Sequence, residues 1–193
     1  MLALYLISKP TINLQEIVLQ AILGGVSIVQ LRDKECSDQV MIDQAISLQQ
    51  ILPNNVPLII NDRLRVAKHV GAGLHVGMSD VCPVEARHQL GDDVIIGLTI
   101  HDRVELAEQY QHVIDYVGVG PIFTTKTKKD AKNPLGVKAL ASIVHRCPVS
   151  VVAIGGITAN SVAEVRATGV SGVAVCSAIM DAHEPLLAVK ELL

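Results

Sequence analysis

Three polar side chains at alternate positions end the second aliphatic run of the sequence. Gln30, Arg32 and Lys34 follow the stretch 26–29. Because successive side chains of a strand point to opposite faces, these three share one face if the run is a β-strand. Two cations beside an amide suit a polyanion such as diphosphate. The alternative is a segment that simply becomes polar as it leaves the core.

Two carboxylates follow the next two aliphatic runs. Asp62 comes directly after the stretch 58–61, and Asp80 stands four residues beyond the stretch 73–76. Either could cap the helix expected after it, because a carboxylate accepts hydrogen bonds from the free N–H groups of a first helical turn. Neighbouring strand ends would instead bring both carboxylates together. Such a pair can hold Mg²⁺ jointly with substrate phosphates.

Hydroxyl groups and lysines follow the fifth and sixth runs. Thr99 ends the fifth run, and the segment 124–130 interleaves three threonines with three lysines. These residue types can bind the anionic groups of a substrate, although a charge run is more often a solvated loop. His75 and His101 also stand near the ends of runs, which makes them candidate acids or bases.

Small residues end the last two runs. Gly155 and Gly156 follow the seventh run, and Cys176 and Ser177 follow the eighth. Backbone N–H groups of such residues can approach a phosphate closely, and this is a frequent phosphate site when the strands form a barrel. Each pair could also be ordinary turn chemistry. The sequence therefore suggests a second anion site, separate from the one beside Arg32.

The elements that must position these groups repeat along the chain. Short aliphatic runs alternate with stretches of helical spacing, at about 24 residues per unit. The runs cover residues 2–8, 26–31, 57–60, 73–76, 94–98, 116–119, 149–154 and 172–175, and the helical stretches cover residues 13–23, 37–51, 62–69, 83–90, 102–109, 136–145, 159–168 and 184–193. This α/β pattern predicts one domain over residues 1–193, a (β/α)₈ TIM barrel with its site at the carboxyl ends of the strands. An open doubly wound sheet is less favoured, because no G-x-G-x-x-G motif follows the first run.

Composition excludes several classes of protein. A net charge of −3 and an aromatic content of 2% disfavour a nucleic-acid binder. No apolar stretch approaches the roughly 20 residues of a membrane span, and residues 1–8 lack the basic start of a signal peptide. The cysteines, which form no C-x-x-C pair, are expected to be reduced thiols of a cytoplasmic protein rather than zinc ligands; they are Cys36, Cys82, Cys147 and Cys176.

Taken in order, these motifs resemble the thiamine phosphate synthase family. The resemblance is carried by the segments 29–34 (VQLRDK), 60–62 (IND), 74–77 (LHVG) with Asp80, 118–129 (GVGPIFTTKTKK) and 153–157 (AIGGI). It extends over essentially the whole chain, and the combination is specific although each motif alone is weak. It implies a (β/α)₈ barrel enzyme, a transferase that joins hydroxymethylpyrimidine diphosphate to thiazole phosphate and releases thiamine monophosphate and diphosphate.

The resemblance also implies a role for each candidate residue. It assigns the pyrimidine diphosphate to Gln30, Arg32, Lys34, Asn61, Thr99 and Lys128, the thiazole phosphate to Thr125, Thr127, Gly156, Cys176 and Ser177, and Mg²⁺ to Asp62 and Asp80. Where other members often carry Ser, this chain has Thr99, which keeps the hydroxyl.

The chemistry that the resemblance implies is a dissociative displacement. Mg²⁺ with Arg32, Lys34 and Lys128 would stabilise the departing diphosphate, without a covalent intermediate on the protein. Two alternatives stay open: a related thiazole tautomerase, which would need neither the metal carboxylates nor the diphosphate cations, and a non-catalytic barrel that binds thiamine phosphates. The expected partners are small phosphorylated molecules, and a homo-oligomer is left open.

Overall fold

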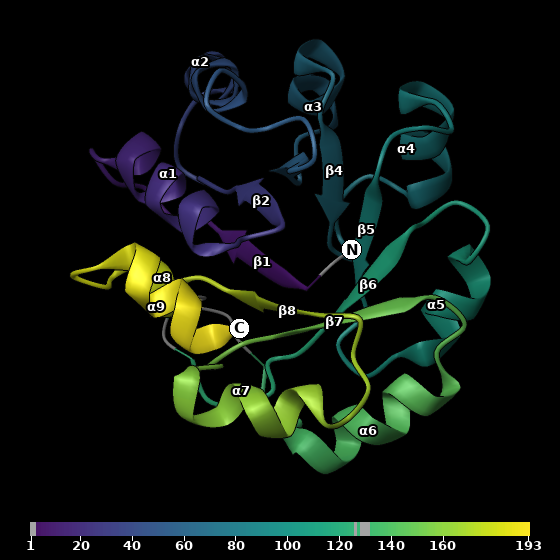
Figure 1. The fold of residues 1–193 in the computed structure, drawn as a ribbon. Coiled ribbons are helices and arrows are strands. Elements are labelled where there is room, and N and C mark those ends of the chain that lie inside the picture. Colours follow the sequence, from purple (N-terminus) through teal and green to yellow (C-terminus); the bar gives the residue numbers. More distant parts are fainter. Residues whose placement is uncertain (1–2, 126, 128–131) are drawn as a thin grey trace.

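The strands form one closed parallel barrel. The computed structural model describes residues 3–125, 127 and 132–193. Within these residues the barrel runs in sequence order from β1 to β8, and β1 pairs with both β2 and β8 to close it. Helices lie around the outside of the ring (Figure 1). The predicted (β/α)₈ architecture is confirmed.

The described elements alternate as the sequence pattern predicts. The strands are β1 (Leu4–Ile7), β2 (Ile28–Leu31), β3 (Leu58–Asn61), β4 (Gly73–Val76), β5 (Ile96–Thr99), β6 (Tyr116–Val119), β7 (Ser150–Ile154) and β8 (Gly172–Val175). The helices are α1 (Leu14–Gly24), α2 (Asp38–Gln49), α3 (Leu64–Val70), α4 (Pro83–Leu90), α5 (Val104–Tyr110), α6 (Gly136–Arg146), α7 (Ala159–Arg166), α8 (Ser177–Met180) and α9 (Pro185–Leu192).

Two differences from the predicted elements lie at the ends of strands. The helix expected from residue 62 begins at Leu64, because Asp62 takes a left-handed φ of 62° that a helix cannot contain. The short helix α8, directly after β8, was not predicted at all. Its four residues are too few to show helical spacing in the sequence.

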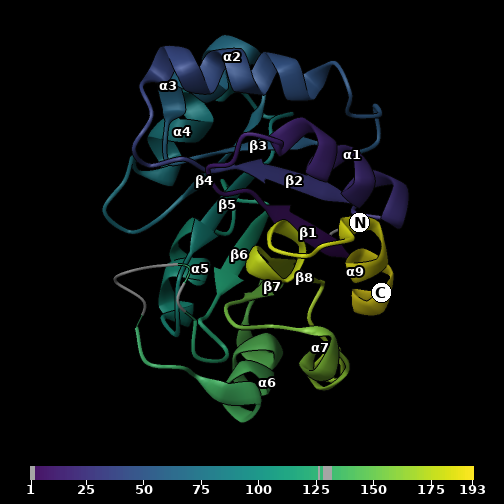
Figure 2. The same cartoon turned by 90° about the vertical axis from the view of Figure 1, so that its left-hand side faces the viewer.

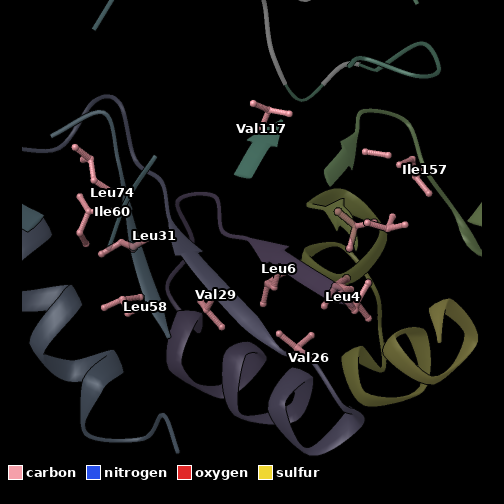
Figure 3. Packing of buried hydrophobic residues seen from close by; sticks show 14 of the residues in the cluster. Leu4, Leu6, Val26, Val29, Leu31, Leu58, Ile60, Leu74, Val117 and Ile157 are labelled. Atoms are coloured by element: carbon pink, nitrogen blue, oxygen red, sulfur yellow. The ribbon is translucent and has the colours of Figure 1, made fainter. Parts of the chain in front are cut away.

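Alternation along each strand divides the core into two layers. Leu4 and Leu6 of β1 pack outward against the helices, together with residues such as Val29 and Leu31 of β2 (Figure 3). The opposite faces of the same strands fill the inside of the barrel, and the residues packed there are Tyr5, Ile7, Ile28, Ile59, Tyr116, Val152 and Ala174. The aliphatic composition therefore supplies the outer layer, whereas two of the three tyrosines occupy the centre.

The last helix completes the ring by packing beside the first (Figures 1 and 2). Gly24 of α1 allows this close approach, because a Cβ there would lie 2.7 Å from the Cβ of Val189 in α9. None of the described helices is long and apolar enough to cross a membrane.

Candidate functional site

A cavity of about 400 Å³ opens at the carboxyl ends of the barrel strands. Its wall includes residues from the end of every strand, from Ile7 of β1 to Val175 of β8. It also contains each of the predicted site residues that the structure describes: Gln30, Arg32, Lys34, Asn61, Asp62, Asp80, Thr99, Thr125, Thr127, Gly156, Cys176 and Ser177. The predicted Lys128 lies outside the described residues.

Cations and carboxylates meet at one end of this cavity. The Lys34 Nζ atom lies 3.2 Å from Asp62 Oδ2. Arg32, in the same loop after β2, donates its backbone N–H to the buried hydroxyl of Ser8 over 2.9 Å. These contacts join the ends of β1, β2 and β3, so that Lys34 lies beside a carboxylate and Arg32 lines the same cavity.

Neither carboxylate caps a helix. Asp62 stands before the N-cap of α3, which is Arg63, and its backbone N–H bonds to the His75 carbonyl at 2.8 Å. Asp80 stands before the N-cap of α4, which is Cys82, and its Oδ2 accepts the Gly77 N–H at 2.6 Å. The capping interpretation of the sequence is therefore wrong for both, because each lies in the turn between its strand and its helix.

The two carboxylates are neighbours in space. Burial raises the pKa of the Asp80 carboxyl above its ordinary value. The Gly77 N–H lowers this pKa and the adjoining Asp62 carboxylate raises it. Asp62 also holds a left-handed backbone conformation, which is uncommon for a residue other than glycine and is found most often where function requires it. Two adjoining carboxylates are the kind of ligand that a divalent cation such as Mg²⁺ takes.

The guanidinium of Arg63 holds the loop that carries Lys34. Its Nη2 atom donates to the Asp33 and Cys36 carbonyls at 3.1 and 2.6 Å, and its Nη1 atom lies 3.0 Å from Asp38 Oδ1. Four-fifths of this side chain is shielded from solvent. Since Arg63 directly follows Asp62, one residue ties the β2–α2 loop to the β3–α3 turn.

We expect the Arg63→Ala substitution to lower the free energy of unfolding by about 2 kcal/mol, because it leaves several carbonyls without a charged donor. Turnover should also fall, since Lys34 would lose its fixed place beside Asp62. Urea unfolding and steady-state kinetics measure the two effects. The control is Arg65→Ala, at an exposed position of α3, the helix that Arg63 precedes as its N-cap. Equal stability of the two variants would contradict this role for Arg63.

The opposite end of the cavity consists of closely packed backbone. Gly156 has a φ of 68°, and a Cβ at this position would lie 2.6 Å from the Thr124 carbonyl oxygen. Gly155 accepts the Phe123 N–H at 2.9 Å. Thr125, whose Oγ1 accepts the Thr127 N–H at 3.3 Å, extends this wall. The loops after β6 and β7 therefore support each other, and only glycine fits at their contact.

Cys176 and Ser177 complete this end, between β8 and α8. Burial raises the pKa of the Cys176 thiol to about 11, against smaller lowering effects of Lys9 and Arg32. The thiol therefore stays protonated near neutral pH and is a poor nucleophile.

The low reactivity of Cys176 can be measured. At pH 8 we expect iodoacetamide to modify the exposed Cys82 much faster than Cys176, because the thiolate is the reacting species and burial suppresses it. Mass spectrometry of digested samples over time gives both rates. Equal rates at the two sites would contradict a buried, protonated Cys176.

Polar side chains cross the floor of the cavity between its two ends. Gln30 Nε2 lies 2.8 Å from Tyr5 Oη, and Tyr5 Oη lies 2.9 Å from Tyr116 Oη. His75 places Nδ1 2.9 Å from Tyr116 Oη and Nε2 2.8 Å from Thr99 Oγ1. Burial raises the pKa of both tyrosines above the ordinary value, so both hydroxyls remain protonated. A hydrogen-bonded floor with protonated tyrosines therefore joins Gln30 to Thr99.

Several residues of this site were missed by sequence reasoning. Lys132, which lines the cavity, was not predicted, whereas His101, a predicted candidate, lines it with a φ of 57° and its Nδ1 atom 2.6 Å from the Gly120 carbonyl oxygen. The acid or base role expected of His75 and His101 stays a prediction. Tyr5 and Tyr116 had no chemical role in the sequence interpretation. Their inward positions on short strands were the signal that could have indicated one.

Comparison with known proteins identifies the family. The family model described as thiamine monophosphate synthase matches residues 4–179. A thiamine-phosphate synthase of Psychrobacter sp. (strain PRwf-1) is 38% identical over 200 aligned positions, which cover 100% of this chain and 94% of that protein. The thiamine-phosphate synthase of Syntrophomonas wolfei is 42% identical, over 94% of this chain and 90% of its own length.

Solved structures agree with these relatives. The thiamine phosphate pyrophosphorylase of Pyrococcus furiosus superposes with a TM-score of 0.89 at 33% identity, covering 99% of this chain and 93% of that one. A 3-hexulose-6-phosphate synthase superposes with a TM-score of 0.70 at 18% identity, which shows a shared fold alone. The relatives confirm the expectation of an enzyme of the transferase class. The chain belongs to the thiamine monophosphate synthase family.

Proposed function

We propose that this protein joins 4-amino-2-methyl-5-hydroxymethylpyrimidine diphosphate to thiazole phosphate, producing thiamine monophosphate and diphosphate. The observation that carries this proposal is one cavity whose two ends differ in chemistry, with cationic side chains at one and closely packed backbone at the other. Arg32 and Lys34 stand at the first end, and the backbone around Gly156 and Ser177 forms the second. A substrate that carries a diphosphate and a substrate that carries a single phosphate would thereby meet over the hydrogen-bonded floor.

The proposed reaction needs electrostatic stabilisation and alignment from the protein. The C–O bond between the pyrimidine methylene and the diphosphate breaks, and its electron pair leaves with the diphosphate. The thiazole nitrogen then supplies the pair for a new C–N bond to the same methylene. Arg32 and Lys34, with Lys128 as a further prediction, would stabilise the charge on the leaving group. Holding both substrates in one cavity supplies the alignment.

The carboxylate pair fits Mg²⁺. Among the described residues there is no group of three or more His, Cys, Asp or Glu side chains that could enclose a metal ion. Mg²⁺ does not need one, because it commonly takes one or two carboxylates and completes its shell with water and substrate phosphates. Asp62 and Asp80 would hold it, because the two carboxylates adjoin each other on the cavity wall. Bound Mg²⁺ would help neutralise the diphosphate.

Incubation of the purified protein with both substrates and Mg²⁺ tests the proposal. We expect thiamine monophosphate and diphosphate in equal amounts, and neither product when one substrate is omitted. Chromatography with an enzymatic diphosphate assay detects both. Binding of both substrates without product would support the non-catalytic alternative, and isomerisation of the thiazole phosphate alone would support the tautomerase. Either result would overturn the proposal.

A further inference from the structure

The hydrogen bonds across the floor of the cavity are all donated in one direction, from Gln30 toward Thr99. Gln30 places its amide nitrogen on the Tyr5 hydroxyl, and an amide nitrogen donates but does not accept. Tyr5 has one hydroxyl hydrogen, which therefore turns to Tyr116. The Tyr116 hydrogen in turn is donated to Nδ1 of His75. The orientation of the Gln30 amide thereby fixes which atom donates in each hydrogen bond as far as His75.

The imidazole extends this direction to the far end. A neutral His75 that accepts at Nδ1 carries its hydrogen on Nε2, which donates to Thr99 Oγ1 at 2.8 Å. The hydrogen of Thr99 is then available to the cavity. At the other end the Gln30 amide, with its nitrogen directed to Tyr5, has its oxygen available to the cavity. The two ends thus show opposite hydrogen-bonding character.

A glycine in β5 leaves room for the contact between Tyr116 and His75. Gly97 occupies the inward position of β5, and a Cβ there would lie 2.5 Å from Tyr116 Oη and 2.6 Å from His75 Nδ1. The Tyr116 and His75 rings stack with centroids 5.5 Å apart and an interplanar angle of 28°. Because both tyrosines are almost completely buried, a hydroxyl left without a partner at any link would destabilise the barrel. The whole chain of bonds is therefore held together as one unit.

We propose that Tyr5, Tyr116 and His75 are positioning residues that make Gln30 an acceptor and Thr99 a donor toward the cavity. The site would thereby select a ligand heterocycle that presents an N–H donor to Gln30 and a hydrogen-bond acceptor to Thr99. The identity of that ligand as the aminopyrimidine diphosphate rests on the proposed function, whereas the direction of the hydrogen bonds does not. If Gln30 turned its amide oxygen to Tyr5, the donor and acceptor in every hydrogen bond of the floor would have to exchange.

The tautomer of His75 tests the direction without any ligand. In protein labelled with ¹⁵N at histidine, at a pH where this imidazole is neutral, we expect NMR to show the hydrogen on Nε2. Tyr116→Phe removes the donor to Nδ1 and should move the Nδ1 resonance toward that of an unbonded ring nitrogen, with the hydrogen still on Nε2. Tyr5→Phe should leave the tautomer unchanged, because Tyr116 still donates. Tyr110→Phe, which changes the remaining tyrosine on α5, is the matched control. A wild-type Nδ1–H form, or an Nδ1 resonance that does not move in Tyr116→Phe, would overturn the proposed direction.

Selectivity between two ligands tests the positioning role. The probes are the aminopyrimidine diphosphate and an analogue with an oxo group in place of the amino group. We expect the wild type to favour the amino compound by at least about 100-fold in kcat/KM, since a site built to accept an N–H rejects a group that only accepts. Both Tyr5→Phe and Tyr116→Phe should reduce this preference below about 10-fold, with the KM for thiazole phosphate unchanged. Tyr110→Phe should keep it.

The outcomes separate the inference from the proposed function. Full preference in both variants would show that the tyrosines serve packing alone, and would overturn the positioning role. A wild-type protein that binds neither compound would overturn the ligand assignment together with the proposed function. The NMR result would still decide the direction of the hydrogen bonds in that case.

Discussion

Asp62→Asn should lower turnover with Mg²⁺ by about 10²- to 10³-fold while leaving the barrel folded, because it removes one of the two carboxylates proposed to hold the ion. Asparagine is the appropriate replacement, since it tolerates the left-handed φ of 62° better than alanine does. The charge of the site also changes in a defined way. Lys34 loses its anionic partner at 3.2 Å, so the affinity for the diphosphate substrate alone should fall much less than turnover does.

Kinetics as a function of Mg²⁺ concentration check this expectation. The apparent affinity for Mg²⁺ should decrease in Asp62→Asn, and circular dichroism should show an unchanged fold. Asp92→Asn is the control, because Asp92 is exposed in the loop before β5, at the amino ends of the strands. Wild-type activity of Asp62→Asn would mean that this carboxylate does not serve the reaction.

Gly156→Ala should destabilise the protein by about 3 kcal/mol and raise the KM for thiazole phosphate at least about 10-fold. Two costs add. A side chain at a φ of 68° costs about 1–2 kcal/mol. The new Cβ would also lie 2.6 Å from the Thr124 carbonyl oxygen and 2.8 Å from the Phe123 Cβ, so that the loop after β6 must shift.

Gly71→Ala separates these two costs. Gly71 ends α3 with a nearly equal φ of 65°, and a Cβ there would meet no atom within 4 Å. It should therefore lose only about 1–2 kcal/mol and keep wild-type kinetics. Urea unfolding of both variants, with KM values for each substrate, makes the comparison. If the two variants behaved alike, backbone strain alone would explain Gly156, and the contact between the loops would have no special role.

The positions of the site residues could be predicted because barrel strands end on the same face. Gln30, Arg32 and Lys34 alternate across the end of β2, and this spacing alone indicated that they share a face. Gly156 and Ser177 follow β7 and β8, where barrels frequently bind phosphate. Local rules of this kind need no knowledge of which distant residues become neighbours.

The parts that escaped prediction depend on long-range contacts or on unusual backbone. Tyr5 and Tyr116 stand 111 residues apart and read as ordinary core aromatics until the closed barrel brings their hydroxyls together. The left-handed turn at Asp62 also gave no signal, because a carboxylate before a helical stretch is typical of a cap. Nothing in the composition of the segment 177–180 distinguished the short helix α8 from a loop.

The pair of tyrosines at the barrel centre has a spectroscopic consequence. The chain contains no tryptophan and three tyrosines, so its near-ultraviolet absorption comes mainly from tyrosine. The Tyr5 and Tyr116 rings lie 5.9 Å apart at 68° to each other, in an asymmetric and rigid environment. With Tyr110 replaced by phenylalanine, the near-ultraviolet circular dichroism would arise mainly from this pair. That signal would then report on the interior of the barrel during unfolding or ligand binding, without any attached label.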